Sequence, residues 1–313
     1  MENMTHPDAS NFPPAYGVPK EAVAARRQLQ DNADLATAVV RRAGSLAARM
    51  RATGVETQFK TSISDVVTEA DHSAERQVFE TLASLRPDDG ILGEEGTNKP
   101  SESGYTWVID PVDGTYNFTS GSDYWCSAVA LVKGDTRDLS DLKVLNDPAR
   151  VVLGAVHRPA TGETWIGGPE LGTTRIDNEG NAEELRIEGV EGPSALSQIS
   201  VGTYLHSTVF GQASGADSDP EDTADIAAWS RAVSASATWR VKGSASIDLA
   251  SVAGGQFGAW FQRDVKPWDW LPGYALVLGA GGAGDLVGRW RVAGSAQAVA
   301  ELAEILGGSE GNS

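Results

Sequence analysis

The sequence contains little cysteine and little positive charge, and each shortage excludes a class of site. Cys126 is the only cysteine among 313 residues, so an internal disulfide, a thiolate zinc cluster and an iron–sulfur centre are excluded. The 25 Lys and Arg residues are outnumbered by 43 Asp and Glu residues, which gives a formal net charge of −18. This balance argues against partners that are held through phosphate neutralisation, both nucleic acids and anionic membrane surfaces.

Long apolar runs are also missing. No stretch reaches the roughly 18 to 20 apolar residues that a membrane span needs, and the first 20 residues lack the apolar core of a secretory signal. We therefore expect a cytoplasmic protein with no membrane partner. The four histidines are scattered without the spacing of a metal site, and Cys126 lies in an apolar stretch that is typical of an inert core thiol.

Apolar periodicity predicts alternating helices and short strands in three parts. Residues 1–30 are predicted to be a flexible N-terminal extension, because three prolines lie close together and no apolar stripe is present. An N-terminal α/β half at 31–200 and a C-terminal α/β half at 201–313 would then enclose a cleft. Two acidic segments, 134–150 and 211–225, are predicted to be solvated surface loops.

The periodic segments themselves are as follows. Helical spacing begins at Asp34, and a second helix is expected over 69–86. The remaining predicted helices are 246–253, 270–278 and 296–306, and the predicted strands are 91–92, 105–109, 126–132, 151–157, 238–241 and 258–261.

The segment W-V-I-D-P-V-D-G-T at residues 107–115 is the most informative one. Pro111 cannot continue a hydrogen-bonded ladder and should end the strand, which leaves Asp110 and Asp113 at the edge where open α/β sheets bind ligands. Gly114 allows close approach of a ligand, and Thr115 can begin a helix whose free N–H groups suit phosphate. Two adjacent carboxylates favour a hard cation such as magnesium, calcium or manganese. The alternative is an ordinary turn capped by Asp113.

Three further acidic segments have both a chemical and an ordinary interpretation. Glu94 and Glu95 lie between glycines and should project from a strand end, or else form a charged turn. Asp269 lies between two tryptophans that would shield it, so it needs a base or a metal as partner, unless it caps a helix. Asp71 fits the first turn of the second helix, and Lys60 fits an exposed loop.

Taken in order, these four segments resemble the inositol monophosphatase family, which belongs with fructose-1,6-bisphosphatase to a magnesium-dependent, lithium-sensitive phosphatase superfamily. The resemblance covers about residues 31–310. It is carried by D-x-V-T-x-x-D at 65–71, G-E-E at 93–95, D-P-V-D-G-T-Y-N-F at 110–118, and W-D at 268–269 followed by a glycine-rich helix end at 279–282.

The resemblance implies a fold, an activity and a cofactor. The fold class would be α/β (α+β), as a five-layer αβαβα sandwich of the sugar phosphatase type, commonly a homodimer. The activity would be magnesium-dependent hydrolysis of inositol 1-phosphate, or a similar small polyol phosphate, by a metal-activated water. Two or three Mg²⁺ ions per subunit are implied, at a site that Mn²⁺ or Ca²⁺ can also occupy, together with inhibition by lithium.

The resemblance also assigns roles to individual residues. Glu94 and Thr115 would orient the attacking water, Asp71 would be hydrogen-bonded behind Thr115, and Lys60 would lie near the metals. The implied metal ligands are Glu94, Glu95, Asp110, the Val112 carbonyl, Asp113 and Asp269. The implied substrate-binding residues, on the phosphate side and then the sugar side, are Gly114, Thr115, Gly243, Ser244, Ala245 and Gln262.

The substrate is the open part of this interpretation. Gln262 stands where animal members have a glutamate that contacts an inositol hydroxyl. Histidinol-phosphate phosphatase activity by the same chemistry is the alternative, and hydrolysis of nucleotide 3′-phosphates or fructose bisphosphate is less expected. A catalytically inactive, metal-binding relative is a third possibility, which the complete acidic set argues against.

Overall fold

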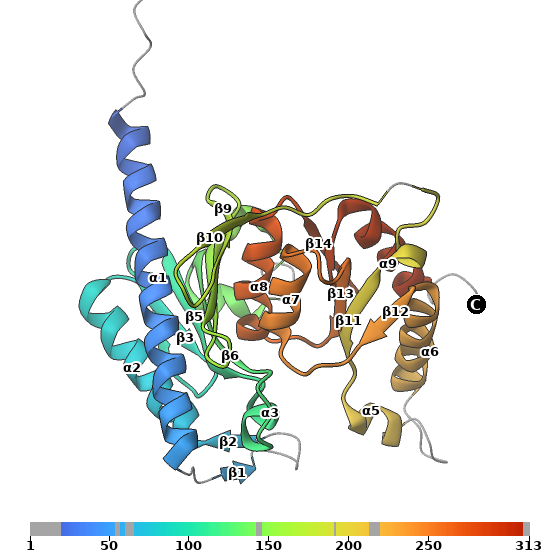
Figure 1. Ribbon diagram of the computed structural model, residues 1–313, viewed down its shortest axis with the longest axis horizontal. Helices are drawn as coiled ribbons and strands as arrows, with labels where there is room; N and C mark the ends of the chain where they lie inside the picture. The colour runs from blue at the N-terminus through green and yellow to red at the C-terminus, as the bar shows by residue number, and fades with distance from the viewer. Residues whose placement is uncertain are drawn as a thin grey trace, which may run out of the picture.

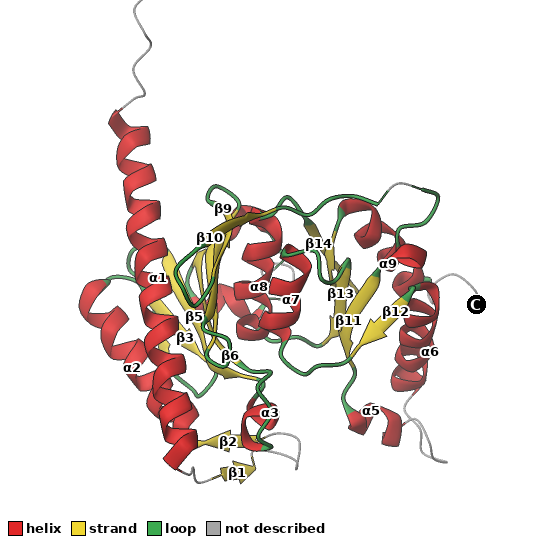
Figure 2. Cartoon of the chain, in the orientation of Figure 1, coloured by secondary structure: helices red, strands yellow, loops and turns green. Residues whose placement is uncertain are grey.

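Two β-sheets organise the fold, one in each half of the chain (Figures 1 and 2). The computed structural model describes residues 20–53, 57–59, 66–141, 146–190, 192–212 and 220–308. The larger sheet has eight strands in the spatial order β10-β9-β8-β7-β6-β5-β3-β4, and the smaller one has five in the order β12-β11-β13-β15-β14. A separate antiparallel pair consists of β1 (Thr57–Phe59) and β2 (Val66–Thr68).

The strands of the larger sheet are β3 (Gly90–Gly93), β4 (Asn98–Lys99), β5 (Tyr105–Asp113), β6 (Cys126–Lys133), β7 (Val151–Arg158), β8 (Glu163–Gly168), β9 (Gly172–Ile176) and β10 (Ala182–Leu185). The strands of the smaller sheet are β11 (Ser200–Tyr204), β12 (Thr238–Arg240), β13 (Ala259–Arg263), β14 (Ala283–Val287) and β15 (Trp290–Gly294).

Helices cover both faces of each sheet and so build five layers. Helices α1 (Lys20–Thr53) and α2 (Glu69–Leu85) lie on the outer face of the larger sheet, and α7 (Ala245–Ala253) and α8 (Pro267–Gly279) lie between the sheets (Figure 2). Helices α6 (Pro220–Ala235) and α9 (Ala296–Gly307) cover the outer face of the smaller sheet. The short helix α3 (Thr115–Thr119) follows β5 at one end of the larger sheet, and α5 (Ser207–Gln212) follows β11 at one end of the smaller sheet. The predicted αβαβα sandwich is confirmed.

Strand β5 shows why the sheet is buried on both faces. Trp107 and Ile109 pack with the helices of the outer layer, whereas Val108 packs with the middle layer that contains Trp270. Successive side chains of a strand point to opposite faces, so a central strand between two helical layers is apolar at consecutive positions. The result is a rigid strand whose end carries Asp110 and Asp113.

Pro111 does not end this strand, contrary to the prediction. Strand β5 continues to Asp113, which pairs with Cys126, and the register shifts between Asp110 and Asp113. A bulge is a place where a ladder can accommodate a proline, because the missing N–H has no partner to satisfy there. Ser127 Oγ donates a hydrogen bond of 2.6 Å to the Pro111 carbonyl. Across this bulge, carboxylate oxygens of Asp110 and Asp113 come within 4.8 Å of each other.

Two other predicted boundaries were wrong. Helix α1 begins at Lys20, so residues 20–30 are helical and the predicted extension 1–30 is too long. Residues 20–30 are mostly good helix formers such as alanine, arginine and glutamine, and Leu29 packs against the core of the outer layer. The rest of the predicted extension, 1–19, lies outside the described residues.

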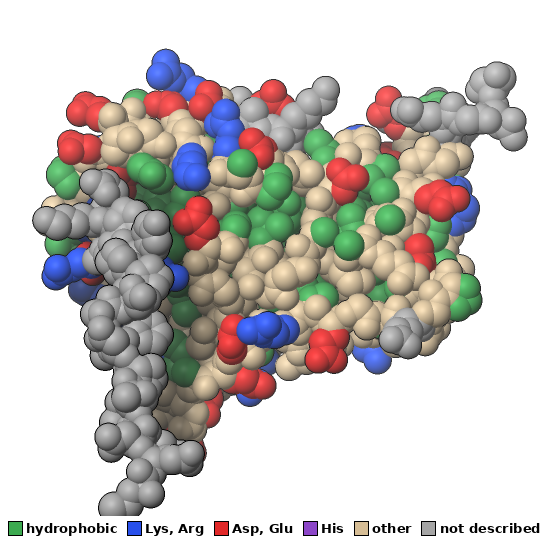
Figure 3. Space-filling model, turned by 90° about the horizontal axis from the view of Figure 1, so that it is seen from above, with side chains coloured by type: hydrophobic (Ala, Val, Ile, Leu, Met, Phe, Trp, Pro, Cys, Tyr) green, Lys and Arg blue, Asp and Glu red, His purple; other side chains and the backbone are tan. Residues whose placement is uncertain are grey.

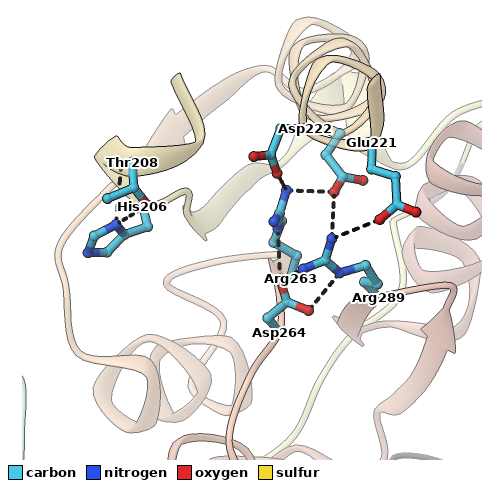
Figure 4. A network of polar contacts seen from close by, with 8 residues as sticks. His206, Thr208, Glu221, Asp222, Arg263, Asp264 and Arg289 are labelled. Atoms are coloured by element: carbon cyan, nitrogen blue, oxygen red, sulfur yellow. Dashed lines mark hydrogen bonds and ion pairs between the residues drawn. The ribbon is translucent and has the colours of Figure 1, made fainter. Parts of the chain in front are cut away.

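The acidic segment 211–225 is only partly a loop, because α6 begins at Pro220. Two of its acidic residues, Asp222 and Asp225, accept hydrogen bonds of 2.8 and 2.6 Å from Arg263 Nη1 on β13 (Figure 4). All three side chains are at most 16% exposed. The prediction failed here because the partner that neutralises these acids is far away in sequence.

The surface carries charges of both signs, and Figure 3 shows acidic and basic side chains interspersed around apolar ones on the face that it presents.

The predicted loop at 134–150 contains two short 3₁₀ turns, Thr136–Ser140 and Pro148–Arg150, and residues 142–145 lie outside the described part. Among the helices that are described, none combines the length and the apolar character needed to cross a bilayer.

Candidate active site

A pocket of about 450 Å³ lies where the two halves of the chain meet at the end of β5. It is lined by the ends of strands, by the start of α3 and by the first turns of α7 and α8. Most of the predicted site residues line it, namely Glu94, Asp110, Val112, Asp113, Gly114, Thr115, Gly243, Ser244, Ala245, Gln262 and Asp269.

Three carboxylates converge in this pocket from both halves of the chain. Asp110 and Asp113 come from β5, and Asp269 comes from the first turn of α8. Each of the three offers one carboxylate oxygen, and these oxygens all lie within 4.8 Å of one another. Asp110 and Asp113 are buried, at 1% and 5% exposure. Such a cluster is repulsive unless a cation or protons neutralise it.

Asp110 provides the test of whether this donor set fits a metal. Both of its carboxylate oxygens are buried and have no hydrogen-bond partner within the described part of the chain. Burial raises the pKa of Asp110 well above its usual range, and the charges of Glu94, Asp113 and Asp269 raise it further. A buried carboxylate without a donor is costly. Hard carboxylate oxygens in this number fit Mg²⁺, Mn²⁺ or Ca²⁺.

Asp113 is instead fixed by the start of α7. Its Oδ2 accepts a hydrogen bond of 2.6 Å from the Ser246 N–H and one of 3.0 Å from Ser244 Oγ, and its Oδ1 accepts one of 3.3 Å from the Ala245 N–H. Burial raises the pKa of Asp113, and these hydrogen bonds oppose that rise. The segment that the resemblance assigned to the sugar-side pocket therefore also orients a metal ligand.

Thr115 and Asp71 lie together, as expected. Thr115 Oγ1 is 3.1 Å from Asp71 Oδ1 and 3.0 Å from the Val112 carbonyl oxygen, so its single proton can go to either acceptor. Asp71 is fully buried and forms a capping box with Thr68 at the start of α2. Burial raises the pKa of Asp71 to about 6, although hydrogen bonds from Thr68 lower it.

Gly114 requires the backbone freedom of glycine. Its φ angle of 91° is in the left-handed region, and a Cβ atom at this position would lie 2.9 Å from the Gly243 carbonyl oxygen. Asn117 Nδ2 lies 2.8 Å from the Tyr124 carbonyl oxygen and 2.7 Å from that of Lys242. These contacts fix the beginning of α3 against the segment that leads into α7.

The neighbouring residues Glu94 and Glu95 have different surroundings. Glu94 lines the pocket, whereas the Glu95 carboxylate is 3% exposed and lies 3.7 Å from His72 Nδ1. Glu75 shapes this turn, because its carboxylate accepts the N–H groups of Glu95 and Thr97 at 2.8 and 3.1 Å. Metal ligation by Glu95 therefore stays a prediction. Lys60 lies outside the described residues.

Sequence reasoning did not find every residue of this pocket. Tyr204, Lys242 and Asp248 also line it. The Tyr124 hydroxyl donates a hydrogen bond of 2.7 Å to Asp248 Oδ1, and burial raises the pKa of Asp248 to about 7. An aspartate inside an apolar helix, as in A-S-I-D-L-A at 245–250, is a signal that could have revealed Asp248. Cys126, as predicted, is a buried thiol, and burial raises its pKa well above the usual range.

Comparison with known proteins decides the family. A sequence model described as the inositol monophosphatase family matches residues 28–303 of this chain. The chain belongs to the inositol monophosphatase family. Membership identifies it as a phosphatase, a phosphoric monoester hydrolase.

Individual relatives agree in sequence and in fold. An inositol-1-monophosphatase of Rhizobium meliloti (strain 1021) is 31% identical over 227 residues, which is 70% of this chain and 71% of that protein. The inositol-1-monophosphatase SuhB of Mycobacterium tuberculosis (strain ATCC 25618 / H37Rv) is 33% identical over 250 residues, or 78% and 76% of the two chains. The crystal structure of the extragenic suppressor protein suhB from Bartonella henselae superposes with a TM-score of 0.71 at 21% identity, over 92% of this chain and all of that one, which shows the shared fold.

Proposed function

We propose that this member of the family is a Mg²⁺-dependent phosphatase that acts on inositol 1-phosphate or a similar small polyol phosphate. The observation that carries the metal part is the buried, unpartnered carboxylate of Asp110, whose neighbours Asp113 and Asp269 come from two different halves of the chain. Glu94 and Val112 line the same pocket, and the Val112 carbonyl oxygen lies 3.0 Å from Thr115 Oγ1. These groups, with Glu95 beside them, would hold two or three metal ions.

The bound Mg²⁺ ions would attract the phosphate dianion, lower the pKa of a coordinated water and stabilise the leaving alkoxide. The residues of the chain prepare the site for this chemistry. Asp113 cannot rotate away, because three donors of α7 and its preceding turn hold it. Gly114 and Thr115 would present their main-chain N–H groups to the phosphate.

Thr115, Asp71 and Glu94 would control the attacking water. When Thr115 Oγ1 donates its proton to Asp71, 3.1 Å away, the hydroxyl oxygen is left as an acceptor and can receive a proton of the water in a hydrogen bond. The Glu94 carboxylate would accept a hydrogen bond from the other hydrogen of the water. The water is thereby oriented toward the phosphorus atom, and its attack requires no covalent intermediate with the protein.

The other end of the pocket suits a polyol. Gln262 near the end of β13 can donate and accept hydrogen bonds with a hydroxyl group. Ser244 before α7 donates its own proton to Asp113, so toward a substrate hydroxyl its oxygen can act only as an acceptor. Tyr204 adds an aromatic side chain to the same wall. A volume of about 450 Å³ is in the range of small-molecule sites. Inhibition by lithium, homodimeric assembly and a cytoplasmic location are further parts of the proposal, supported by membership of the family.

A substrate panel tests the proposed activity. The purified chain would be incubated with inositol 1-phosphate, histidinol phosphate, a nucleotide 3′-phosphate and fructose 1,6-bisphosphate, with Mg²⁺ or with EDTA, and released phosphate would be measured. We expect Mg²⁺-dependent release, inhibited by lithium and fastest from inositol 1-phosphate among the monophosphates. Release that persists in EDTA, or no release from any of the esters, would refute the proposal.

A further inference from the structure

The charges that line the pocket are unequal in sign. Among the described residues of its lining, five are acidic, namely Glu94, Asp110, Asp113, Asp248 and Asp269, whereas Lys242 alone is basic. Four of the acids surround the proposed metals, and the fifth, Asp248, has a different neighbourhood, because it accepts the Tyr124 hydroxyl. Lys242 therefore supplies the one positive charge among the described residues of the lining, and it lies close to Asp248.

Lys242 is held in place by aromatic rings. Its Nζ lies 4.8 Å from the ring centroid of Tyr124 and 5.0 Å from that of Phe257. Asp248 is close enough for the charge of Lys242 to lower its pKa, against the larger effect of burial. Among the described residues, the ion pairs of 4.0 Å or less do not include Lys242. Its ammonium group is thus placed against two ring faces, near Asp248 but with no described carboxylate within ion-pair distance.

The main chain of Lys242 is tied to the phosphate side of the pocket. Its carbonyl oxygen accepts a hydrogen bond of 2.7 Å from Asn117 Nδ2, two residues beyond Thr115. Its side chain is exposed and has a flexible four-carbon stem. A bound anion can therefore draw the ammonium from the ring faces, because a charge-assisted hydrogen bond is stronger than an exposed cation–π contact.

We propose that Lys242 forms a subsite for a second anionic group on the substrate. The subsite rests on the proposed phosphatase function: the metals would take the ester phosphate, and Lys242 would bind a further phosphate or carboxylate on the same molecule. Without this lysine, the charged side chains among the described residues of the lining would all be acidic, namely Asp248 and the carboxylates of the metal site. The same charge repels an ammonium group. Lys242 thus selects among small phosphate esters by the sign of the charge that they carry besides the phosphate.

Substrates of opposite charge test this subsite. We would measure kcat/KM for fructose 1,6-bisphosphate and for histidinol phosphate, each relative to inositol 1-phosphate, in the wild type and in Lys242→Gln and Lys242→Arg variants. Lys242→Gln should lower the ratio for the bisphosphate about tenfold and raise the ratio for histidinol phosphate about threefold, whereas Lys242→Arg should keep both ratios within threefold of the wild type.

Arg240→Gln is the matched control, because it removes a positive charge two residues away, on β12 and outside the pocket lining. It should leave both ratios unchanged. Thermal unfolding of all variants would detect a loss of folded protein. If Lys242→Gln changes the three kcat/KM values by the same factor, or changes none of them, Lys242 has no role in selection and the subsite is refuted.

Calorimetric titration of the Ca²⁺-loaded protein with the same three compounds separates the subsite from the proposed activity. Lys242→Gln should weaken binding of fructose 1,6-bisphosphate about tenfold relative to inositol 1-phosphate. If the wild type releases no phosphate but Lys242→Gln selectively weakens binding of the bisphosphate, the proposed activity is refuted and the subsite is supported. If the wild type hydrolyses the esters but Lys242→Gln weakens binding of fructose 1,6-bisphosphate and inositol 1-phosphate equally, the activity is supported and the subsite is refuted.

Discussion

Replacing Asp110 by asparagine should make the metal-free protein more stable and the metal-loaded protein inactive. The Asp110 carboxylate is buried with no hydrogen-bond partner in the described chain, and it shares a cluster no wider than 4.8 Å with Asp113 and Asp269. At an effective dielectric constant of about 20, two unit charges at that distance repel by roughly 3 kcal/mol. Protonation avoids the repulsion, but at pH 7 it costs about 4 kcal/mol for a carboxyl with an ordinary pKa.

A neutral asparagine amide avoids both the charge repulsion and the free energy of protonation, and it introduces a smaller cost. Its own buried polar atoms, left without partners, cost on the order of 1–2 kcal/mol. In EDTA at pH 7, Asp110→Asn should therefore increase the free energy of unfolding by about 2 kcal/mol relative to the wild type. With Mg²⁺ at about 100 times its dissociation constant, the wild type should gain about 2.7 kcal/mol, and the variant should gain almost nothing.

Urea unfolding curves with and without Mg²⁺ measure both effects, and phosphate release measures activity. Asp123→Asn is the control, because the Asp123 carboxylate is 76% exposed and lies outside the pocket; it should change neither stability nor the Mg²⁺ response. Our account of Asp110 is wrong if the asparagine variant is less stable than the wild type in EDTA, or if Mg²⁺ stabilises both proteins equally.

The other predictions concern the water, a buried histidine and a buried ion pair. Thr115→Val should lower kcat about 100-fold with little change in KM, while Thr115→Ser keeps kcat within tenfold of the wild type; steady-state kinetics that show more than a third of the wild-type kcat in the valine variant would exclude the hydroxyl from catalysis. Burial lowers the pKa of His157 to about 4, so between pH 6.5 and 4 the unfolded chain binds a proton that the folded chain does not, and stability should fall by roughly 3 kcal/mol as the pH drops through that window. Urea unfolding at several pH values checks this, and His157→Gln should remove that part of the slope. Arg263→Met leaves the buried Asp222 carboxylate without its arginine partner (Figure 4) and leaves Asp225 with only the longer, 3.8 Å contact to Arg289. It should cost about 3–5 kcal/mol of unfolding free energy, whereas Arg186→Met, in an exposed pair, should cost less than about 1 kcal/mol in the same denaturation assay.

The sequence predicts the site best where the relevant contacts are local. Asp110, Asp113 and Thr115 lie within six residues, and the continuous apolar run just before them indicates a buried strand that ends close to them. The convergence of Asp269 with them depends on the packing of α8 between two sheets, which no spacing reveals. The resemblance to a family placed Asp269 in the metal site, whereas the local sequence pattern around Asp269 did not.

The remaining errors have a common physical cause, which is compensation by a distant part of the chain. Asp222 looks solvated in sequence because Arg263, its partner, is 41 residues away. Pro111 looks like a strand end because the bulge opposite Cys126 is set by the pairing of β5 with β6. Lys242 was not singled out, since a lone lysine has no pattern, and only the folded pocket shows that its neighbours there are acids.

Crystals of the protein soaked in Mn²⁺ would show, through the anomalous scattering of the metal, whether the three aspartates form a metal site. We expect anomalous peaks among Asp110, Asp113 and Asp269, within coordination distance of their oxygens and next to Glu94. Strong peaks elsewhere on the molecule with none among these carboxylates would contradict this expectation.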